Sequence, residues 1–105
     1  NLSCQGVIVG SAVGRARLSV MGAHHPDDQV GVITAALSSA GATPADIGYV
    51  ECNGISTRIG DPFEYEALSR TYGADGAAVP VGTHTPLYGH TLFSSGLLSI
   101  VKVLL

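Results

Sequence analysis

Three short apolar runs along the chain, rich in β-branched residues, predict three strands. The first run, GVIVGSAV at 6–13, contains two glycines and can extend to Leu18. The second run covers 49–52, and the third covers 79–83. Each run is followed by a segment with a helical pattern, so the predicted order of elements is β-α-β-α-β-α.

The segment after the first run carries the signals of a helix. Asp27 and Asp28 supply the negative charge that is favoured at a helix start, and Gly41 favours a helix end. Thr43-Pro44 resembles a cap followed by proline, and it predicts a single turn that ends near Ile47. Between Asp28 and Gly41, apolar residues recur at steps of 3, 4 and 3, which predicts one helix face: Val30, Ile33, Leu37 and Ala40.

Two further helices complete the pattern. Asp61 as a cap and Pro62 at the first helical position predict a second helix, which runs to Tyr72 and ends at Gly73. A third helix at 94–105 is apolar on nearly every side, which is typical of a helix buried inside a larger body. The order predicts an α/β fold with a mainly parallel sheet. No stop signal follows the last apolar residues, so we expect residues 1–105 to be a partial domain, truncated at its end.

Composition narrows the possible partners. Hydrophobic residues make up 46% of the chain and charged residues 12%, the formal charge is −3, and basic residues form no run. We therefore expect no nucleic-acid partner and no membrane partner, and the longest apolar stretch is shorter than the about 20 residues of a membrane span. No signal peptide is visible, and Cys4 and Cys52 have no CxxC spacing, which favours the cytoplasm. The four histidines have no cysteine or carboxylate at ligand spacing, so we expect no metal site.

Two loops are the predicted place of a functional site. In parallel sheets, ligands gather beyond the carboxyl ends of the strands. The loops 53–60 and 84–89 follow predicted strands, precede helices and are rich in Gly, Ser and Thr. Four glycines in or beside these loops are expected to serve tight turns with positive φ: Gly54, Gly60, Gly82 and Gly89.

The residues of these loops resemble the ketosynthase family of polyketide synthases. The segment at 49–64, YVECNGISTRIGDPFE, is similar to the family signature YVEAHGTGTxLGDPIE. The segment at 81–96, VGTHTPLYGHTLFSSG, resembles VGSVKSNIGHxEAAAG. The order and the spacing of both motifs agree with the family, and the resemblance covers almost the whole chain.

This resemblance implies a thiolase-like condensing domain made of two similar halves, of which this chain would be the C-terminal one. In the family, a cysteine of the first half accepts an acyl chain from acyl carrier protein. Two histidines of the second half then assist decarboxylation of a malonyl unit. The implied substrate is an acyl-phosphopantetheine thioester, with no other cofactor. The implied partners are the remaining half of the domain, acyl carrier protein and a second copy in a homodimer.

The catalytic motifs depart from the family at three positions. Asn53 stands at the first histidine, Thr85 at the lysine, and Leu87 at an asparagine, whereas His90 matches the second histidine. Neither cysteine of the chain sits in the nucleophile motif. The resemblance therefore suggests His90 and the degenerate position Asn53 as catalytic residues, and Ser56, Thr57 and Thr85 as substrate-binding residues. Six residues are expected to be structural, Glu51 as a buried, paired carboxylate among them: Glu51, Gly54, Asp61, Pro62, Glu64 and Gly89.

These departures favour a domain that accepts and passes on acyl groups without extending them, with the fragment inactive alone. An amide at Asn53 can donate a hydrogen bond, but it cannot carry charge or move a proton near neutral pH. One alternative is a structural or docking pseudo-domain without catalysis. Another is an active condensing enzyme that uses Asn53 together with His90.

Overall fold

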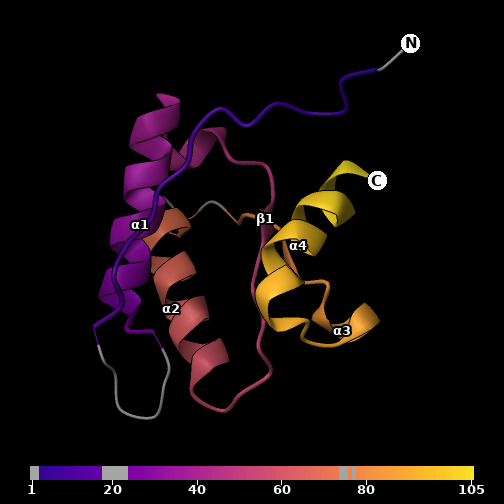
Figure 1. The fold of residues 1–105 in the computed structure, drawn as a ribbon. Coiled ribbons are helices and arrows are strands. Elements are labelled where there is room, and N and C mark those ends of the chain that lie inside the picture. Colours follow the sequence, from indigo (N-terminus) through magenta and orange to yellow (C-terminus); the bar gives the residue numbers. More distant parts are fainter. Residues whose placement is uncertain (1–2, 18–23, 74–75, 77) are drawn as a thin grey trace.

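A computed structural model describes residues 3–17, 24–73, 76 and 78–105 (Figure 1). Leu18 and the loop at 21–23 lie outside the described residues, so the predicted extension of the first strand concerns a part not described here. The predicted first helix is confirmed as α1, Pro26–Ala40. His25 caps its start, because the His25 Nδ1 accepts a hydrogen bond from the Asp27 N–H at 3.2 Å. Gly41 ends it in the left-handed conformation at φ 65°, and the predicted turn follows as η2, Pro44–Asp46.

A parallel pair of short strands forms the centre of the fold. Strand β1, Val50–Glu51, pairs with β2, Val81–Gly82, in the register Val50↔Val81. The ladder continues one residue further, where the Cys52 N–H donates to the Gly82 carbonyl at 2.7 Å. The predicted α/β fold with a parallel sheet is therefore confirmed, with strands shorter than the sequence pattern predicts.

The predicted first strand at 6–13 is wrong for this chain. Residues 3–17 form no strand in the described structure. The segment crosses α1 and the end of α4 as an extended chain (Figure 1). Glycines allow this close approach, because a Cβ atom at Gly10 would lie 2.7 Å from the Ala36 carbonyl oxygen. A strand needs a neighbouring strand for its backbone hydrogen bonds, and β1 and β2 pair only with each other among the described residues.

Helices lie on both sides of the strand pair. Helix α2, Gly60–Tyr72, packs beside α1, and α4, Ser95–Leu104, lies on the other side of the strands (Figure 1). An ion pair of 2.7 Å between Arg70 Nη1 and Asp27 Oδ1 joins α2 to the start of α1. The hydrogen bond from Arg70 lowers the pKa of Asp27 below its ordinary value. Ala67 of α2 is fully buried.

Several predicted boundaries need correction. Helix α2 begins at Gly60 with Ile59 as its cap, so Asp61 is not the cap and Pro62 is not the first helical residue. The Asp61 carboxylate instead accepts a hydrogen bond from the Ser56 N–H at 2.9 Å. The loop 84–89 contains a short helix, α3, Thr85–Tyr88, and η3, Leu92–Ser94, precedes α4.

The expectation of positive φ is confirmed at two of the four glycines. Gly54 has a φ of 54° and Gly89 a φ of 78°. It is wrong for Gly60, which is the first residue of α2, and for Gly82, which lies in β2. Both positions need a small residue for space. A Cβ atom at Gly60 would lie 2.6 Å from Thr57 Oγ1, and a Cβ atom at Gly82 would clash with the Tyr49 hydroxyl.

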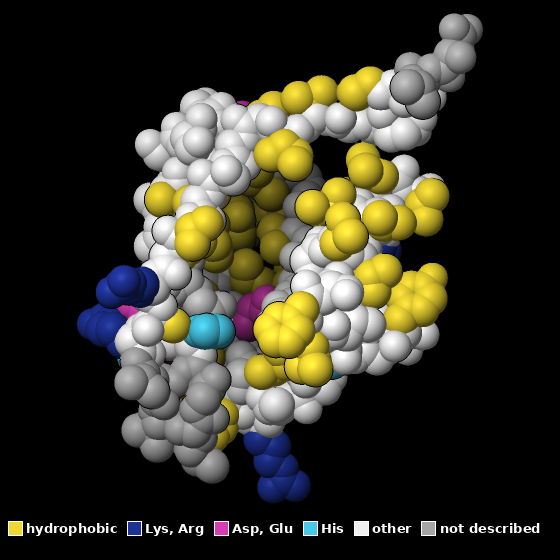
Figure 2. Space-filling view, viewed as in Figure 1, with side chains coloured by type: hydrophobic (Ala, Val, Ile, Leu, Met, Phe, Trp, Pro, Cys, Tyr) yellow, Lys and Arg dark blue, Asp and Glu magenta, His cyan; other side chains and the backbone are white. Residues whose placement is uncertain are grey.

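The C-terminal part of the chain exposes many large apolar side chains. They gather over α3, η3 and α4, beside a hollow with an apolar lining (Figure 2). Burial of α4 in a larger body therefore stays a prediction, because within this chain the helix is covered mainly on the side that faces β1 and β2. The exposed members of this surface include Leu87, Tyr88, Leu92, Phe93, Leu97, Ile100 and Val103.

Candidate functional site

The loop after β1 is held in place by one carboxylate from α2. Glu64 Oε1 accepts a hydrogen bond from the Asn53 N–H at 2.7 Å, and Glu64 Oε2 accepts one from the Gly54 N–H at 2.9 Å. Gly54 is required at this turn for two reasons. Its φ is positive, at 54°, and a Cβ atom there would lie 2.7 Å from Thr83 Oγ1. The structure thus gives Glu64 a direct role in placing Asn53.

Asn53 is also held from α3 and α4, and by Thr83, which follows β2. Its carbonyl oxygen accepts hydrogen bonds from Thr83 Oγ1 at 3.4 Å and from Thr85 Oγ1 at 3.2 Å. Its side-chain Oδ1 accepts a hydrogen bond from Ser95 Oγ at 3.2 Å. Residues from three different elements therefore converge on the position that the family signature assigns to a catalytic histidine.

Asn53 and His90 line the same cavity, whose volume is about 330 Å³. The two loops that the strand-end rule selected therefore meet at one place, as parallel pairing of β1 and β2 requires. An amide and an imidazole that line one cavity can each donate a hydrogen bond to a ligand bound there. The other residues of the lining are His24, Gln29, Ile55, Gly60 and Glu64.

The three predicted substrate-binding residues do not line this cavity. Thr85 is only 8% exposed, and its hydroxyl is engaged with Asn53 and Thr83. Thr57 Oγ1 accepts a hydrogen bond from the Gly60 N–H at 2.9 Å, which stabilises the start of α2. Ser56 is exposed at a φ of 61°. The structure thus gives Thr57 and Thr85 roles in shaping the loops.

His84 is a member of the site that the sequence did not predict. Its side chain is 0% exposed and lies between Ser95 and Ser99 of α4, 3.3 Å from Ser95 Oγ and 3.2 Å from Ser99 Oγ. The sequence did contain a sign of a special role, because the family signature has an apolar valine where this chain has His84. Two serines one turn apart, on a helix that is otherwise apolar except for Lys102, point to the same polar contact.

A buried carboxylate lies next to His84. Glu51 Oε2 accepts hydrogen bonds from Lys102 Nζ at 2.7 Å and from the Tyr49 hydroxyl at 2.6 Å, and its side chain is 6% exposed. Burial opposes ionisation of Glu51, but the hydrogen bonds from Lys102 and Tyr49 outweigh burial and hold its pKa below the ordinary value. The same carboxylate raises the pKa of Lys102.

This pairing predicts a loss of stability in acid. Because the pKa of Glu51 is lower in the folded chain than in the unfolded chain, the pair stabilises the fold above the unfolded value of 4.5. Its contribution is lost as the pH falls through the lower folded value. In an intact domain that contains this chain, urea midpoints between about pH 7 and 3 should fall more steeply for wild type than for Glu51→Gln. The exposed Glu66→Gln is the control, and equal slopes for wild type and Glu51→Gln would contradict the prediction.

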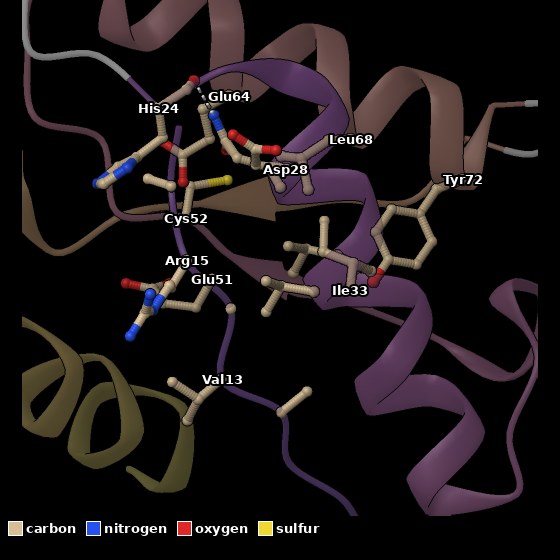
Figure 3. Close-up of a pocket in the computed structure, with 16 residues that line it drawn as sticks. Val13, Arg15, His24, Asp28, Ile33, Glu51, Cys52, Glu64, Leu68 and Tyr72 are labelled. Carbon is tan, nitrogen blue, oxygen red and sulfur yellow. Dashed lines mark hydrogen bonds between the residues drawn. The ribbon is translucent and has the colours of Figure 1, made fainter. Parts of the chain in front are cut away.

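A second, larger cavity of about 500 Å³ adjoins the first and shares His24, Gln29 and Glu64 with it. Figure 3 shows His24, Glu64 and Cys52 at one end of it, and the apolar Ile33, Leu68 and Tyr72 at the other. Burial and the neighbouring carboxylates raise the pKa of the Cys52 thiol to about 11. A thiol with so high a pKa is almost fully protonated at neutral pH, so Cys52 has little nucleophilic character.

Two features are absent from the residues that the structure describes. No group of three or more His, Cys, Asp or Glu side chains in these residues could hold a metal ion. No helix in these residues combines the length and the apolar character that a membrane span requires.

Comparison with known proteins identifies the family. Residues 5–105 match the family described as beta-ketoacyl synthase, C-terminal domain. A phthioceranic/hydroxyphthioceranic acid synthase of Mycobacterium tuberculosis is 42% identical over 77 residues, which are 73% of this chain and 4% of that protein. A PKS-NRPS hybrid synthetase of Aspergillus candidus is 38% identical over 106 residues, which cover 95% of this chain and 4% of the synthetase. The chain thus spans a small fraction of these curated relatives.

Solved structures agree with this assignment. An oxazolomycin ketosynthase domain from Streptomyces albus superposes with a TM-score of 0.81 at 31% identity, over 95% of this chain and 18% of that one. A beta-ketoacyl synthase from Burkholderia phymatum superposes with a TM-score of 0.82 at 28% identity, over 92% of this chain and 23% of that one. The predicted thiolase-like fold is confirmed by these neighbours. The chain belongs to the beta-ketoacyl synthase family, within the C-terminal part of a polyketide-synthase ketosynthase domain.

Proposed function

We propose that this chain belongs to a ketosynthase domain that takes acyl thioesters from acyl carrier protein and passes the acyl group on without extending it. The observation that carries the proposal is the cavity shared by Asn53 and His90. Its position supports a role in binding the thioester, and its residues argue against condensation. Dimerisation of the intact domain and delivery by acyl carrier protein are parts of the same proposal.

Acyl transfer demands little of the residues in this chain. A cysteine thiolate in the other half of the domain attacks the thioester carbonyl, and a new carbon–sulfur bond forms as the bond to pantetheine sulfur breaks. The departing pantetheine thiolate takes up a proton equivalent to the one that the cysteine lost. This step depends on an activated thiolate in the other half. Here the chain contributes Asn53 and His90 to the wall against which the thioester lies.

Decarboxylative condensation demands more. It needs donors for the negative charge that develops on the malonyl thioester oxygen, and a charged or proton-donating imidazole serves best. Asn53 offers only a neutral amide, Thr85 is buried without charge, and Leu87 has no polar group. Loss of one such electrostatic contact costs about 10²–10³ in rate. We therefore infer that three substitutions together remove efficient condensation.

The test uses the intact ketosynthase domain that contains this chain. The domain is incubated with acyl carrier protein loaded with an acyl group, and then with malonyl carrier protein, and both protein and products are followed by mass spectrometry. We expect an acylated domain and no extended product. A ketide-extended product would contradict the loss of condensation, and a domain that never becomes acylated would contradict acyl transfer.

A further inference from the structure

The fully buried His84 connects to Asn53 through one serine. His84 Nε2 lies 3.3 Å from Ser95 Oγ, and Ser95 Oγ donates a hydrogen bond to Asn53 Oδ1 at 3.2 Å. On its other side, His84 Nδ1 lies 3.2 Å from Ser99 Oγ. A buried imidazole is costly unless both ring nitrogens have partners. The two serines supply those partners, so His84, Ser95 and Asn53 form one continuous chain of hydrogen bonds.

Because Asn53 Oδ1 is the acceptor at one end, counting hydrogens gives the direction of each hydrogen bond between His84 and Asn53. A serine hydroxyl has one hydrogen, and Ser95 gives it to Asn53. Ser95 must therefore accept from His84, which places a proton on Nε2 and leaves Nδ1 to accept from Ser99. The Glu51 carboxylate oxygen at 3.9 Å is too far to accept a hydrogen bond from Nδ1. The contacts thus assign the Nε2–H tautomer to His84.

The contact from Ser95 to Asn53 Oδ1, from which this count starts, also gives the orientation of the Asn53 amide. Its oxygen is directed at Ser95, so its NH₂ group, with two donors, is free to face the cavity that His90 also lines. A neutral N–H donor then stands where the family signature has an imidazole.

Three positions of the family signatures change together in this chain. Where the signatures have histidine, valine and alanine, the chain has Asn53, His84 and Ser95. The valine and the alanine could make no side-chain hydrogen bond, so the connection to residue 53 depends on His84 and Ser95.

We infer that His84 is a positioning residue which, through Ser95, holds the donor side of the Asn53 amide towards a carrier-bound thioester. The inference rests on the proposed function, because it assigns the cavity to a thioester carbonyl. His84 itself is buried and touches no substrate. Asn53 is the residue that donates the hydrogen bond to the carbonyl oxygen.

The kinetic test is a double-mutant cycle in the intact domain, with acyl-pantetheine thioester as the acyl donor. Ser95→Ala should lower kcat for acyl transfer roughly fivefold, the effect of one ordinary hydrogen bond, with a smaller change in KM. In the Asn53→Ala background, Ser95→Ala should have no further effect. The matched control is Thr71→Val, which removes another part-buried hydroxyl, bonded to the Ala67 carbonyl, and should leave kcat unchanged.

Two substitutions at His84 test whether an N–H donor at this position is enough to retain the rate of acyl transfer. His84→Leu should match Ser95→Ala, whereas His84→Gln keeps an N–H donor and should retain most of the rate. If Ser95→Ala lowers kcat equally with and without Asn53, or if Asn53→Ala leaves acyl transfer intact, the positioning role is overturned while acyl transfer by the domain stands.

A spectroscopic measurement keeps the inference separate from the proposed function. In the intact domain labelled with ¹⁵N-histidine, the His84 signals, assigned by their loss in His84→Gln, should show the Nε2–H tautomer. The Nδ1–H tautomer would overturn the inference whatever the activity. If the domain accepts no acyl group, the proposed function fails, and the tautomer alone then supports or overturns the orientation of Asn53.

Discussion

Replacing Asn53 with histidine in the intact ketosynthase domain should raise the rate of malonyl decarboxylation by up to roughly 100-fold, the lower end of the range that one oxyanion donor supplies. The backbone of residue 53 is held by the Glu64 carboxylate and by Thr85, and neither contact involves the Asn53 side chain. A histidine would therefore enter at a fixed place in the lining of the cavity that His90 also lines. There an imidazolium can donate a charge-assisted hydrogen bond to the developing enolate oxygen, which a neutral amide cannot.

Decarboxylation is measured as release of labelled carbon dioxide from malonyl carrier protein. Asn53→Gln is the control, because it keeps an amide donor and adds no charge. An unchanged rate in Asn53→His would contradict the proposal that the neutral amide at residue 53 contributes to the loss of condensation. It would favour the alternative in which Asn53 already works with His90 in an active condensing enzyme.

Removing the Glu64 carboxylate should have the second large effect. Glu64→Ala deletes two charge-assisted hydrogen bonds, to the Asn53 and Gly54 N–H groups. Each such bond contributes about 1.5–3 kcal/mol, and water can replace part of this at the more exposed Asn53 N–H, so we expect a loss of about 2–4 kcal/mol of unfolding free energy. Urea denaturation of the intact domain measures this loss, and acyl transfer should fall with it because Asn53 is no longer held.

Two variants of the same helix serve as comparisons. Glu64→Gln keeps one acceptor oxygen and should lie between wild type and Glu64→Ala. Glu66→Ala removes an exposed carboxylate that lies 3.7 Å from Arg70, and it should change stability by less than about 0.5 kcal/mol. If Glu64→Ala were no more damaging than Glu66→Ala, the carboxylate would not be the anchor of the loop.

The parts of the fold that depend on local sequence were predictable. Helix α1 follows from its apolar spacing and from Gly41, and the single turn after Thr43 follows from a local cap. The start of α2 was misplaced by two residues because Gly60, a residue that usually disfavours helices, is helical here, where its N–H is satisfied by Thr57 Oγ1. The strand at 6–13 could not be judged locally, because strand formation depends on a partner elsewhere.

The location of the candidate site was predicted, but its buried residues were not. The rule that ligands gather at strand ends selected both loops, and the structure brings Asn53 and His90 to one cavity. His84 lies in one of these loops, but its burial depends on Ser95 and Ser99 of α4, 11 and 15 residues away, and the sequence alone does not bring these residues together. Similarly, Glu64 reaches back 11 residues to Asn53, a distance that no spacing rule anticipates.

The register Val50↔Val81 has a consequence for the order in which the chain folds. The two strands that carry the site loops are joined by a long crossover, so their pairing must close a large loop before any ladder hydrogen bond forms. Helices α1 and α2 depend on neighbouring residues and can form first, on the microsecond scale of helix formation. The cavity of Asn53 and His90 is therefore assembled late, and partial unfolding that separates β1 from β2 would dismantle it while both helices persist.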